Sequence, residues 1–215
     1  MAVPYVTHTI LALNVILFIL DRNFRIFGPA VVFSDLGMRP DDLYPVFHGG
    51  FSSIAVTSLF TSLWLHVNLT HIIGNMVFLM VFGGSIEITV GPWRFALFYL
   101  LWGFAASLTH FLMDMHSPIP VLGASGAIGG ILGAYFLLYP ANKIDLVIPL
   151  LAFKTFEIPA WMLLGSWFIL QIAVPQEGVA NWAHVGGFLA GMVTVLLMGG
   201  RQVVLKRTTG INYDF

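Results

Sequence analysis

Residues 122–134 read LGASGAIGGILGA, a run of small residues that contains a serine near its start. Small residues recur in it every four positions, as at Gly126 and Gly130. This spacing places them on one face of a helix and lets a second helix approach closely within lipid. The stretch therefore predicts a tightly packed membrane helix with Ser125 near its N-terminus.

The composition of the whole chain agrees with a membrane location. Of its 215 residues, 58% are apolar and only 9% are charged, whereas a soluble domain has about 45–50% and about 25%. So few charges cannot cover a soluble globule, and they exclude a disordered chain or a basic nucleic-acid-binding domain. The absence of cysteine excludes disulfides, thiolate metal sites and a cysteine nucleophile.

Charged residues divide the chain into long uncharged windows. A membrane-spanning helix needs about 20 mostly apolar residues. The windows predict six such helices, over residues 4–20, 69–86, 95–113, 124–140, 158–174 and 182–199. We therefore expect an all-α polytopic membrane protein with a single domain, 1–215, and a core over about 49–199.

The segments between the predicted helices differ in character. Residues 21–68 form one long loop, with short amphipathic pieces such as Phe51–Leu65 at the membrane interface. Residues 141–157 contain Pro149 and are too short to span the membrane, so we expect them at the surface. The polar tail, 200–215, is expected to be mobile and cytoplasmic.

The distribution of basic residues predicts the orientation. Six spans place both termini on one side of the membrane. That side collects six basic residues (Arg94, Lys143, Lys154, Arg201, Lys206 and Arg207), and the other side collects three (Arg22, Arg25 and Arg39). The positive-inside rule then favours cytoplasmic termini in a multi-pass protein, which we expect in the cell membrane.

Strongly polar residues occur near the N-terminal ends of the second, fourth and sixth predicted helices, which start on the same side. These residues are His71, Asn75, Ser125 and His184. Polar groups within spans are costly and indicate function. Gly126 and Gly187 belong to small-residue faces that would bring the fourth and sixth helices together. Ser125 and His184 would then form an activated nucleophile, a hydroxyl group beside a general base.

The same layer offers donors for an oxyanion. The first N–H groups of a helix have no intrahelical partner, and the helix dipole there favours negative charge. His71 and Asn75 are four residues apart, hence on one face of their helix. No carboxylate belongs to the layer, which indicates a Ser-His dyad. His110, Asp114 and His116 fit no metal-binding spacing, and we expect neither a metal nor another cofactor.

Four motifs in this order resemble the rhomboid intramembrane serine proteases in their six-helix form. The motifs are HVNLTHIIGN (66–75), FGGSIE (82–87), GASG (123–126) and AHVGGFLAG (183–191). GASG alone is common in glycine-rich helices, whereas the four together at this spacing are specific. The match runs over about residues 49–199.

The resemblance implies a role for each matching residue. Ser125 is the nucleophile and His184 the general base, while His71, Asn75 and the backbone N–H of Ser125 form the oxyanion hole. Gly123 matches the small residue before the turn, and His66 lies near the site. Glu87 forms structural hydrogen bonds within the first loop and second helix. The loop 174–180 and the helix before it form a movable cap and gate.

The resemblance also implies the partners, which are the lipid bilayer and transmembrane protein substrates cleaved near the non-cytoplasmic face. One departure concerns Gly129, where many members carry an aromatic residue against the histidine. Trp182 or a first-loop residue would then orient His184. Ser62, His66 and Gln171 are candidates for a water path. The alternatives are a non-catalytic binder of transmembrane helices and a small transporter.

Overall fold

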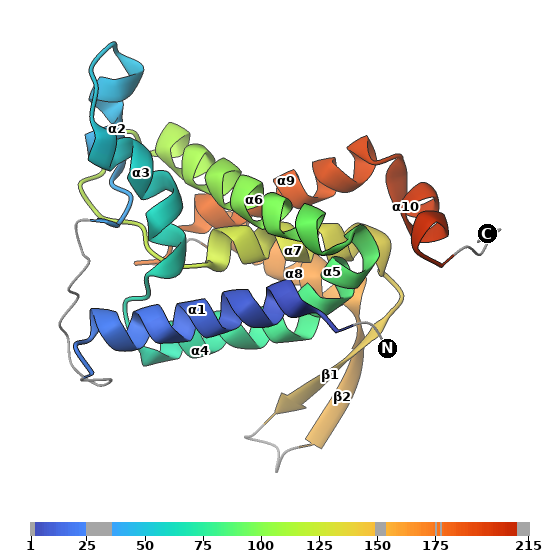
Figure 1. Ribbon diagram of the computed structural model, residues 1–215. Coiled ribbons are helices and arrows are strands. Elements are labelled where there is room, and N and C mark those ends of the chain that lie inside the picture. The colour runs from blue at the N-terminus through green and yellow to red at the C-terminus, as the bar shows by residue number, and fades with distance from the viewer. Residues whose placement is uncertain (1–2, 25–35, 149–153, 175, 177, 210–215) are drawn as a thin grey trace.

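The computed structural model describes residues 3–24, 36–148, 154–174, 176 and 178–209. These residues form a bundle of helices with one two-stranded hairpin (Figure 1). The elements are α1 (Tyr5–Asp21), α2 (Pro40–Phe47), α3 (Ser53–Thr61), η2 (Ser62–Trp64), α4 (Leu69–Phe78), η3 (Leu79–Gly83), α5 (Gly84–Val90), α6 (Pro92–Met113), α7 (Ser125–Leu138), β1 (Lys143–Ile148), β2 (Lys154–Pro159), α8 (Ala160–Ala173), α9 (Asn181–Leu197) and α10 (Gly200–Thr209). The all-α prediction is confirmed, with the hairpin as its one addition among the described residues.

Each of the six predicted spans corresponds to helical structure. The second is continuous over Leu69–Val90, because α4 passes through the π-helical segment η3 into α5, and the third is α6. Both are 22 residues long and apolar enough to cross a membrane. The first, fourth and fifth are the shorter apolar helices α1, α7 and α8. The sixth, α9, bends by 71° into α10.

Helix α7 lies at the centre of the bundle. Eleven of its 14 residues are buried, and it packs against α6, α8, α9 and the α4–α5 segment. A helix of this length rises about 21 Å, less than the roughly 30 Å of a hydrocarbon core. The helix that carries Ser125 is therefore short and enclosed within the bundle.

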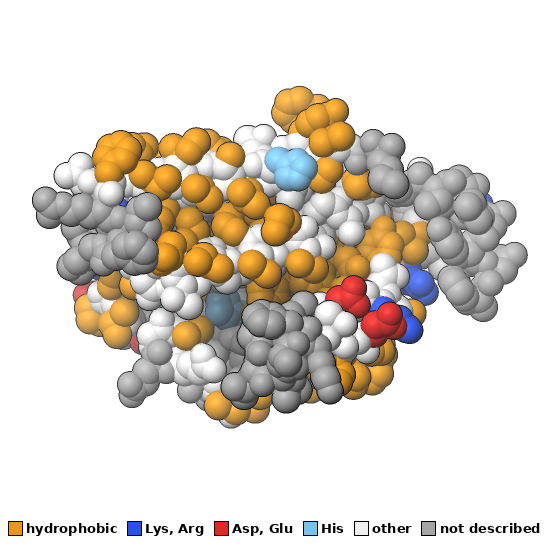
Figure 2. All heavy atoms as spheres, turned by 90° about the horizontal axis from the view of Figure 1, so that it is seen from below, with side chains coloured by type: hydrophobic (Ala, Val, Ile, Leu, Met, Phe, Trp, Pro, Cys, Tyr) orange, Lys and Arg blue, Asp and Glu red, His pale blue; other side chains and the backbone are white. Residues whose placement is uncertain are grey.

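The outer surface of the bundle is largely apolar. Large hydrophobic side chains are exposed on every long helix, for example Leu13 and Ile16 of α1 and Ile73 and Met80 of α4. Figure 2 shows such side chains spread over one face, among which only a few acidic and basic side chains are visible. A surface of this kind suits contact with lipid rather than with water.

The long first loop contains two short helices, of which α3 continues into η2 within the predicted interfacial piece Phe51–Leu65. Both helices pack on the end of α6 through a small cluster that includes Met38, Leu43, Leu59 and Phe111. Arg22, at the end of α1, is buried and donates hydrogen bonds to the carbonyl groups of His66 and Val67. The loop is thus packed against the bundle at both of its described ends.

The structure adds a hairpin to one connecting segment and corrects the expectation for the tail. Within the segment expected at the surface, β1 and β2 pair as an antiparallel hairpin with Lys143 opposite Pro159; residues 149–153 lie outside the described part. The tail begins as the helix α10, in which Val204 and Leu205 are buried. Arg201 Nε also donates to the carbonyl oxygen of Leu138 at 3.0 Å. These contacts hold residues 200–209 against the bundle.

Glu87 has a different partner from the one expected. Its carboxylate receives the N–H groups of Val6 and Thr7, at 2.9 and 2.7 Å, and the Thr7 hydroxyl at 2.7 Å. These donors belong to the first turn of α1, whose N–H groups have no intrahelical partner. Glu87 therefore joins α5 to the start of α1 rather than to the first loop.

Candidate functional site

The start of α4 carries the first two residues of the site. Asn68 is its N-cap, and the Asn68 side chain accepts a hydrogen bond from the backbone N–H of His71 at 2.8 Å. One turn later, Asn75 is 8% exposed, and its Nδ2 has no hydrogen-bond partner among the described residues. A buried, unpaired amide is energetically costly. Asn75 thus presents a donor that a ligand can satisfy.

The chain entering α7 passes directly against these two side chains. Gly123 has a φ of +128°, and a Cβ added to it would lie 2.8 Å from both Cε1 and Nε2 of His71 and 3.5 Å from Nδ2 of Asn75. Its N–H donates to the carbonyl oxygen of Ser62 at 2.9 Å. Both the backbone conformation and the space require glycine here. Ser125 follows as the first residue of α7.

Glycine residues bring α7 and α9 into backbone contact, as the sequence predicts. A Cβ on Gly187 would lie 1.9 Å from the carbonyl oxygen of Gly126, and one on Gly191 would lie 1.9 Å from that of Gly130. Gly129 faces the same partner, since its Cβ would lie 2.9 Å from the carbonyl oxygen of His184. A larger residue at 129 would require the helices to separate.

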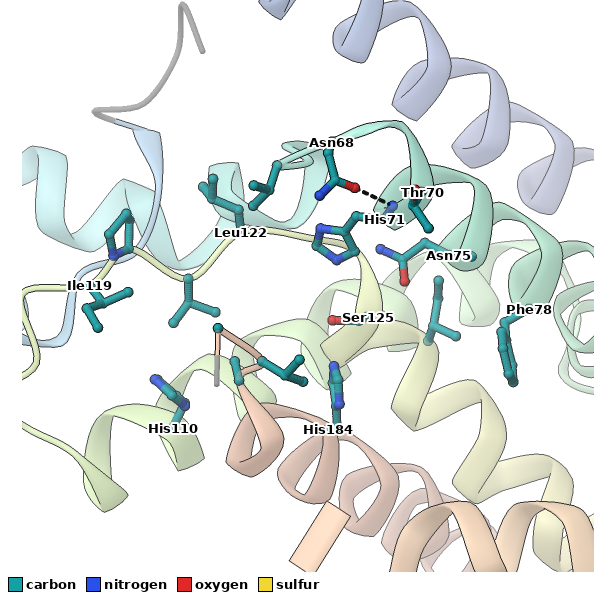
Figure 3. Close-up of a pocket in the computed structure, with 18 of the residues that line it drawn as sticks. Asn68, Thr70, His71, Asn75, Phe78, His110, Ile119, Leu122, Ser125 and His184 are labelled. Atoms are coloured by element: carbon teal, nitrogen blue, oxygen red, sulfur yellow. Dashed lines mark hydrogen bonds between the residues drawn. The ribbon is translucent and has the colours of Figure 1, made fainter. Parts of the chain in front are cut away.

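The residues predicted for the site surround one cavity of about 610 Å³. His71 and Asn75 line it from α4, Ser125 from α7 and His184 from α9. In Figure 3 the His71 ring and the Asn75 amide point toward Ser125 from one side, and the His184 ring rises toward it from the other. Residues of the segments 117–122 and 178–180 line the remaining walls. The helices α4, α7 and α9, which are far apart in the sequence, therefore place these side chains around one cavity.

Helix α8 supplies the groups that hold His184. The Trp167 ring lies against the His184 ring, with 5.6 Å between ring centroids, and Oε1 of Gln171 lies 2.7 Å from Nδ1 of His184. These contacts replace the orientation expected from Trp182 or a first-loop residue. Sequence reasoning missed both roles. The signal for Gln171 was a strongly polar side chain on a largely apolar helix.

Ser62, His66 and Gln171 do not line the cavity as the expected water path requires. They contact residues of the site instead. The carbonyl oxygen of Ser62 accepts a hydrogen bond from the N–H of Gly123, and Gln171 contacts His184. The His66 ring packs edge-on against the His71 ring, with centroids 5.1 Å apart. Burial and the neighbouring His71 lower the pKa of His66 to about 3, so its ring is neutral at physiological pH.

His110 and Asp114 line another part of the cavity. His116 is directed elsewhere and packs against Tyr44, with ring centroids 4.4 Å apart. Within the described ranges, no group of three or more histidine, aspartate or glutamate side chains is arranged to hold a metal ion.

Comparison with protein families gives a match over residues 53–201 to the Rhomboid domain. The chain belongs to the rhomboid family. It is a membrane protein by that membership and by its apolar helices. His71, Asn75, Ser125 and His184 all fall within the matched region of this rhomboid.

Three relatives show how broadly the similarity extends. RHOMBOID-like protein 1 of Arabidopsis thaliana is 32% identical over 145 residues, which cover 64% of this rhomboid and 33% of the relative. Rhomboid protease GluP of Bacillus subtilis (strain 168) is 31% identical over 143 residues, or 66% and 26% of the two chains. Rhomboid protein 1, mitochondrial, of Saccharomyces cerevisiae is 30% identical over 149 residues, or 63% and 40%. This rhomboid thus matches less than half the length of each relative.

Proposed function

We propose that this rhomboid is an intramembrane serine endopeptidase that cleaves transmembrane segments of membrane proteins through a Ser125–His184 dyad. The observation that carries the proposal is the meeting of a hydroxyl group, an imidazole and an unpaired amide donor at one cavity. A nucleophile, a base and an oxyanion donor are the minimum set for acyl transfer. The similarity to a relative named as a rhomboid protease supports the same activity.

In the proposed first half-reaction, the Ser125 hydroxyl oxygen attacks the carbonyl carbon of the scissile peptide. Nε2 of His184 accepts the hydroxyl proton as the new C–O bond forms. Negative charge develops on the carbonyl oxygen. It is stabilised by Nδ2 of Asn75, the His71 ring N–H and the backbone N–H at the start of α7. When the C–N bond breaks, His184 returns its proton to the leaving amine, and an acyl ester remains on Ser125.

The second half-reaction repeats these steps with water. Water attacks the ester carbonyl carbon while Nε2 of His184 accepts one of its protons. The same three donors stabilise the second oxyanion. The ester C–O bond then breaks, the proton returns from His184 to the Ser125 oxygen, and the new carboxyl end of the substrate leaves. The free enzyme is regenerated without a cofactor.

The proposed substrates follow from the position of the cavity. It opens among helices whose outer surfaces are apolar, so a substrate helix can approach through lipid, and its unwound end can enter. In Figure 1 the start of α1 and the helix α10 lie at one end of the bundle, away from α2 and α3. With both termini in the cytoplasm, as the basic residues favour, the active site would lie near the opposite face of the cell membrane.

Cleavage of a model substrate tests the proposal. The full chain, purified and reconstituted in lipid, is mixed with a single-span reporter protein. A fluorophosphonate probe separately reports whether Ser125 is reactive. Wild type should cleave the reporter and take up the probe, whereas Ser125→Ala and His184→Ala should abolish cleavage. The matched controls, Ser166→Ala and His48→Ala, change residues outside the cavity and should retain activity.

The same experiment separates the alternatives. Cleavage that survives in Ser125→Ala would refute the proposed nucleophile. A folded wild-type chain that neither takes up the probe nor cleaves the reporter would point to a non-catalytic binder of transmembrane helices. Solute flux through liposomes that contain the chain would point to the transporter alternative.

A further inference from the structure

A chain of hydrogen bonds leads from the loop before α9 to the histidine of the site. The backbone N–H of Gln176 donates to Oδ1 of Asn181 at 3.1 Å, and Nδ2 of Asn181 donates to Oε1 of Gln171 at 3.0 Å. The same Gln171 oxygen lies 2.7 Å from Nδ1 of His184. Asn181 is buried at the start of α9, and Gln171 lies near the end of α8.

The chemistry of each link fixes the direction of the next. A backbone N–H group can only donate, so Asn181 must turn its oxygen toward Gln176 and its NH₂ group toward Gln171. Gln171 must then turn its oxygen toward Asn181. The NH₂ group of Gln171 donates a hydrogen bond to the carbonyl oxygen of Trp167 at 3.5 Å. The atom that faces Nδ1 of His184 is thus the amide oxygen of Gln171, which can only accept a hydrogen bond. Nδ1 of His184 must therefore carry the proton.

We propose that Gln171 and Asn181 are positioning residues that hold the neutral His184 ring in its Nδ1–H tautomer. The ring then keeps its lone pair on Nε2, the atom that accepts the hydroxyl proton of Ser125 in the proposed function. This inference rests on that function for its catalytic meaning, while the tautomer itself is a property of the resting protein. Trp167 assists by packing on the ring face. An amide pair here does the orienting that a carboxylate does in a Ser-His-Asp triad.

Two substitutions that each exchange one NH₂ group for an oxygen have opposite expected outcomes. Gln171→Glu keeps an acceptor toward both Asn181 and His184, so the Nδ1–H tautomer should persist. Asn181→Asp still accepts from Gln176 but, once ionised, cannot donate to Gln171. The Gln171 amide is then free to rotate and donate to Nδ1 of His184, which moves the ring proton to Nε2. A role limited to packing would make the two variants equally tolerated or equally damaging.

The test combines a spectroscopic and a kinetic measurement on the full chain in lipid at pH 8, well above the ordinary pKa of aspartate and glutamate. Histidine labelled with ¹⁵N reports which ring nitrogen carries the proton, and the His184 signals are assigned by their loss in His184→Gln. The rate of fluorophosphonate labelling and kcat for cleavage of the reporter measure how the tautomer affects the reactivity of Ser125. We expect wild type and Gln171→Glu to hold the proton on Nδ1. Asn181→Asp should shift it to Nε2 and lower the labelling rate and kcat by about 10²-fold or more, since an inverted tautomer in a triad costs about 10⁴-fold.

Asn142→Asp is the matched control, because it makes the same chemical change at an exposed site next to the hairpin, and it should leave both measurements unchanged. A proton on Nε2 of His184 in wild type would overturn the proposal, even if neither variant folds. Equal labelling rates in Gln171→Glu and Asn181→Asp would also overturn it. A wild-type chain with the proton on Nδ1 that neither labels nor cleaves would refute the proposed protease function and support the positioning of His184.

Discussion

The carboxylate of Glu87 on α5 accepts hydrogen bonds from both the backbone N–H and the hydroxyl group of Thr7 on α1, each at 2.7 Å. A third bond comes from the N–H of Val6 at 2.9 Å, and Glu87 is 2% exposed. The buried carboxyl group of Glu87 therefore serves as the cap that the first turn of α1 would otherwise lack, since no side-chain cap forms at its own N-cap residue, Pro4. This joins the first span to the second at the end of the bundle away from the cavity.

Removing this acceptor should destabilise the fold. Glu87→Ala leaves three donors without their partner, and we expect a loss of about 2–4 kcal/mol in the free energy of unfolding, because an unpaired buried donor costs about 1–3 kcal/mol. Thermal unfolding in detergent measures the loss. Glu157→Ala, at the exposed ion pair with Lys143, is the matched control and should leave the unfolding temperature nearly unchanged. Similar effects of the two substitutions would contradict the capping role of Glu87.

The contact between α7 and α9 should not tolerate a methyl group. Gly187→Ala places a Cβ 1.9 Å from the carbonyl oxygen of Gly126, so the helices must separate. We expect a loss of stability of about 1–3 kcal/mol or more, as in other overpacked cores, together with loss of probe labelling. Gly165→Ala on α8 is the control, since its Cβ would make only an ordinary contact at 3.5 Å with Phe136. Unchanged unfolding of Gly187→Ala would show that the two helices pack differently.

Asn75 should affect catalysis without supporting stability. Its Nδ2 has no partner among the described residues of the resting protein, so Asn75→Ala removes a buried, unpaired donor. We expect kcat to fall by about 10²–10³-fold, the usual effect of deleting an oxyanion donor, while the unfolding temperature stays the same or rises. KM should change little. A parallel loss of stability and activity would instead indicate that Asn75 is a structural residue.

The buried ring of His66 should make stability depend on pH. His66 lies in the segment 65–68 between η2 and α4, and its pKa is lowered from 6.5 to about 3 by burial and by His71. Between these values the unfolded chain binds a proton that the folded chain does not. The ring should thus lower stability as the pH falls below 6.5, by at most about 1.4 kcal/mol per pH unit.

Unfolding temperatures measured from pH 4 to 8 test this dependence. His66→Phe keeps a ring of similar size and removes the titration, so the stability of this variant should decline less steeply with acid than that of wild type. His48→Phe, at an exposed position, should follow the wild-type curve. A wild-type slope that persists in His66→Phe would assign the pH dependence to other groups.

Much of the fold could be predicted because hydropathy and spacing are local properties of the chain. Uncharged windows of about 20 residues mark the spans, since buried backbone in lipid must form helices. The four-residue spacing of Gly126, Gly130, Gly187 and Gly191 marks the contact face of α7 with α9. The start positions of alternate spans place His71, Ser125 and His184 in one layer, which is where the structure has them.

The contacts that could not be predicted depend on which faces of helices far apart in the sequence pack against one another. The spacing of residues along the chain does not contain this information. Gln171 and Trp167 reach His184 only because α8 packs beside α9, and Glu87 reaches Thr7 only because α5 lies beside the start of α1. Val204 and Leu205 are buried because α9 turns sharply at Gly199, whose φ is +102°, so that α10 lies back on the bundle. Hydrophobicity and helical period therefore determine the spans and the polar layer. The tertiary packing alone decides the hydrogen-bond partners within that layer, including those that orient His184.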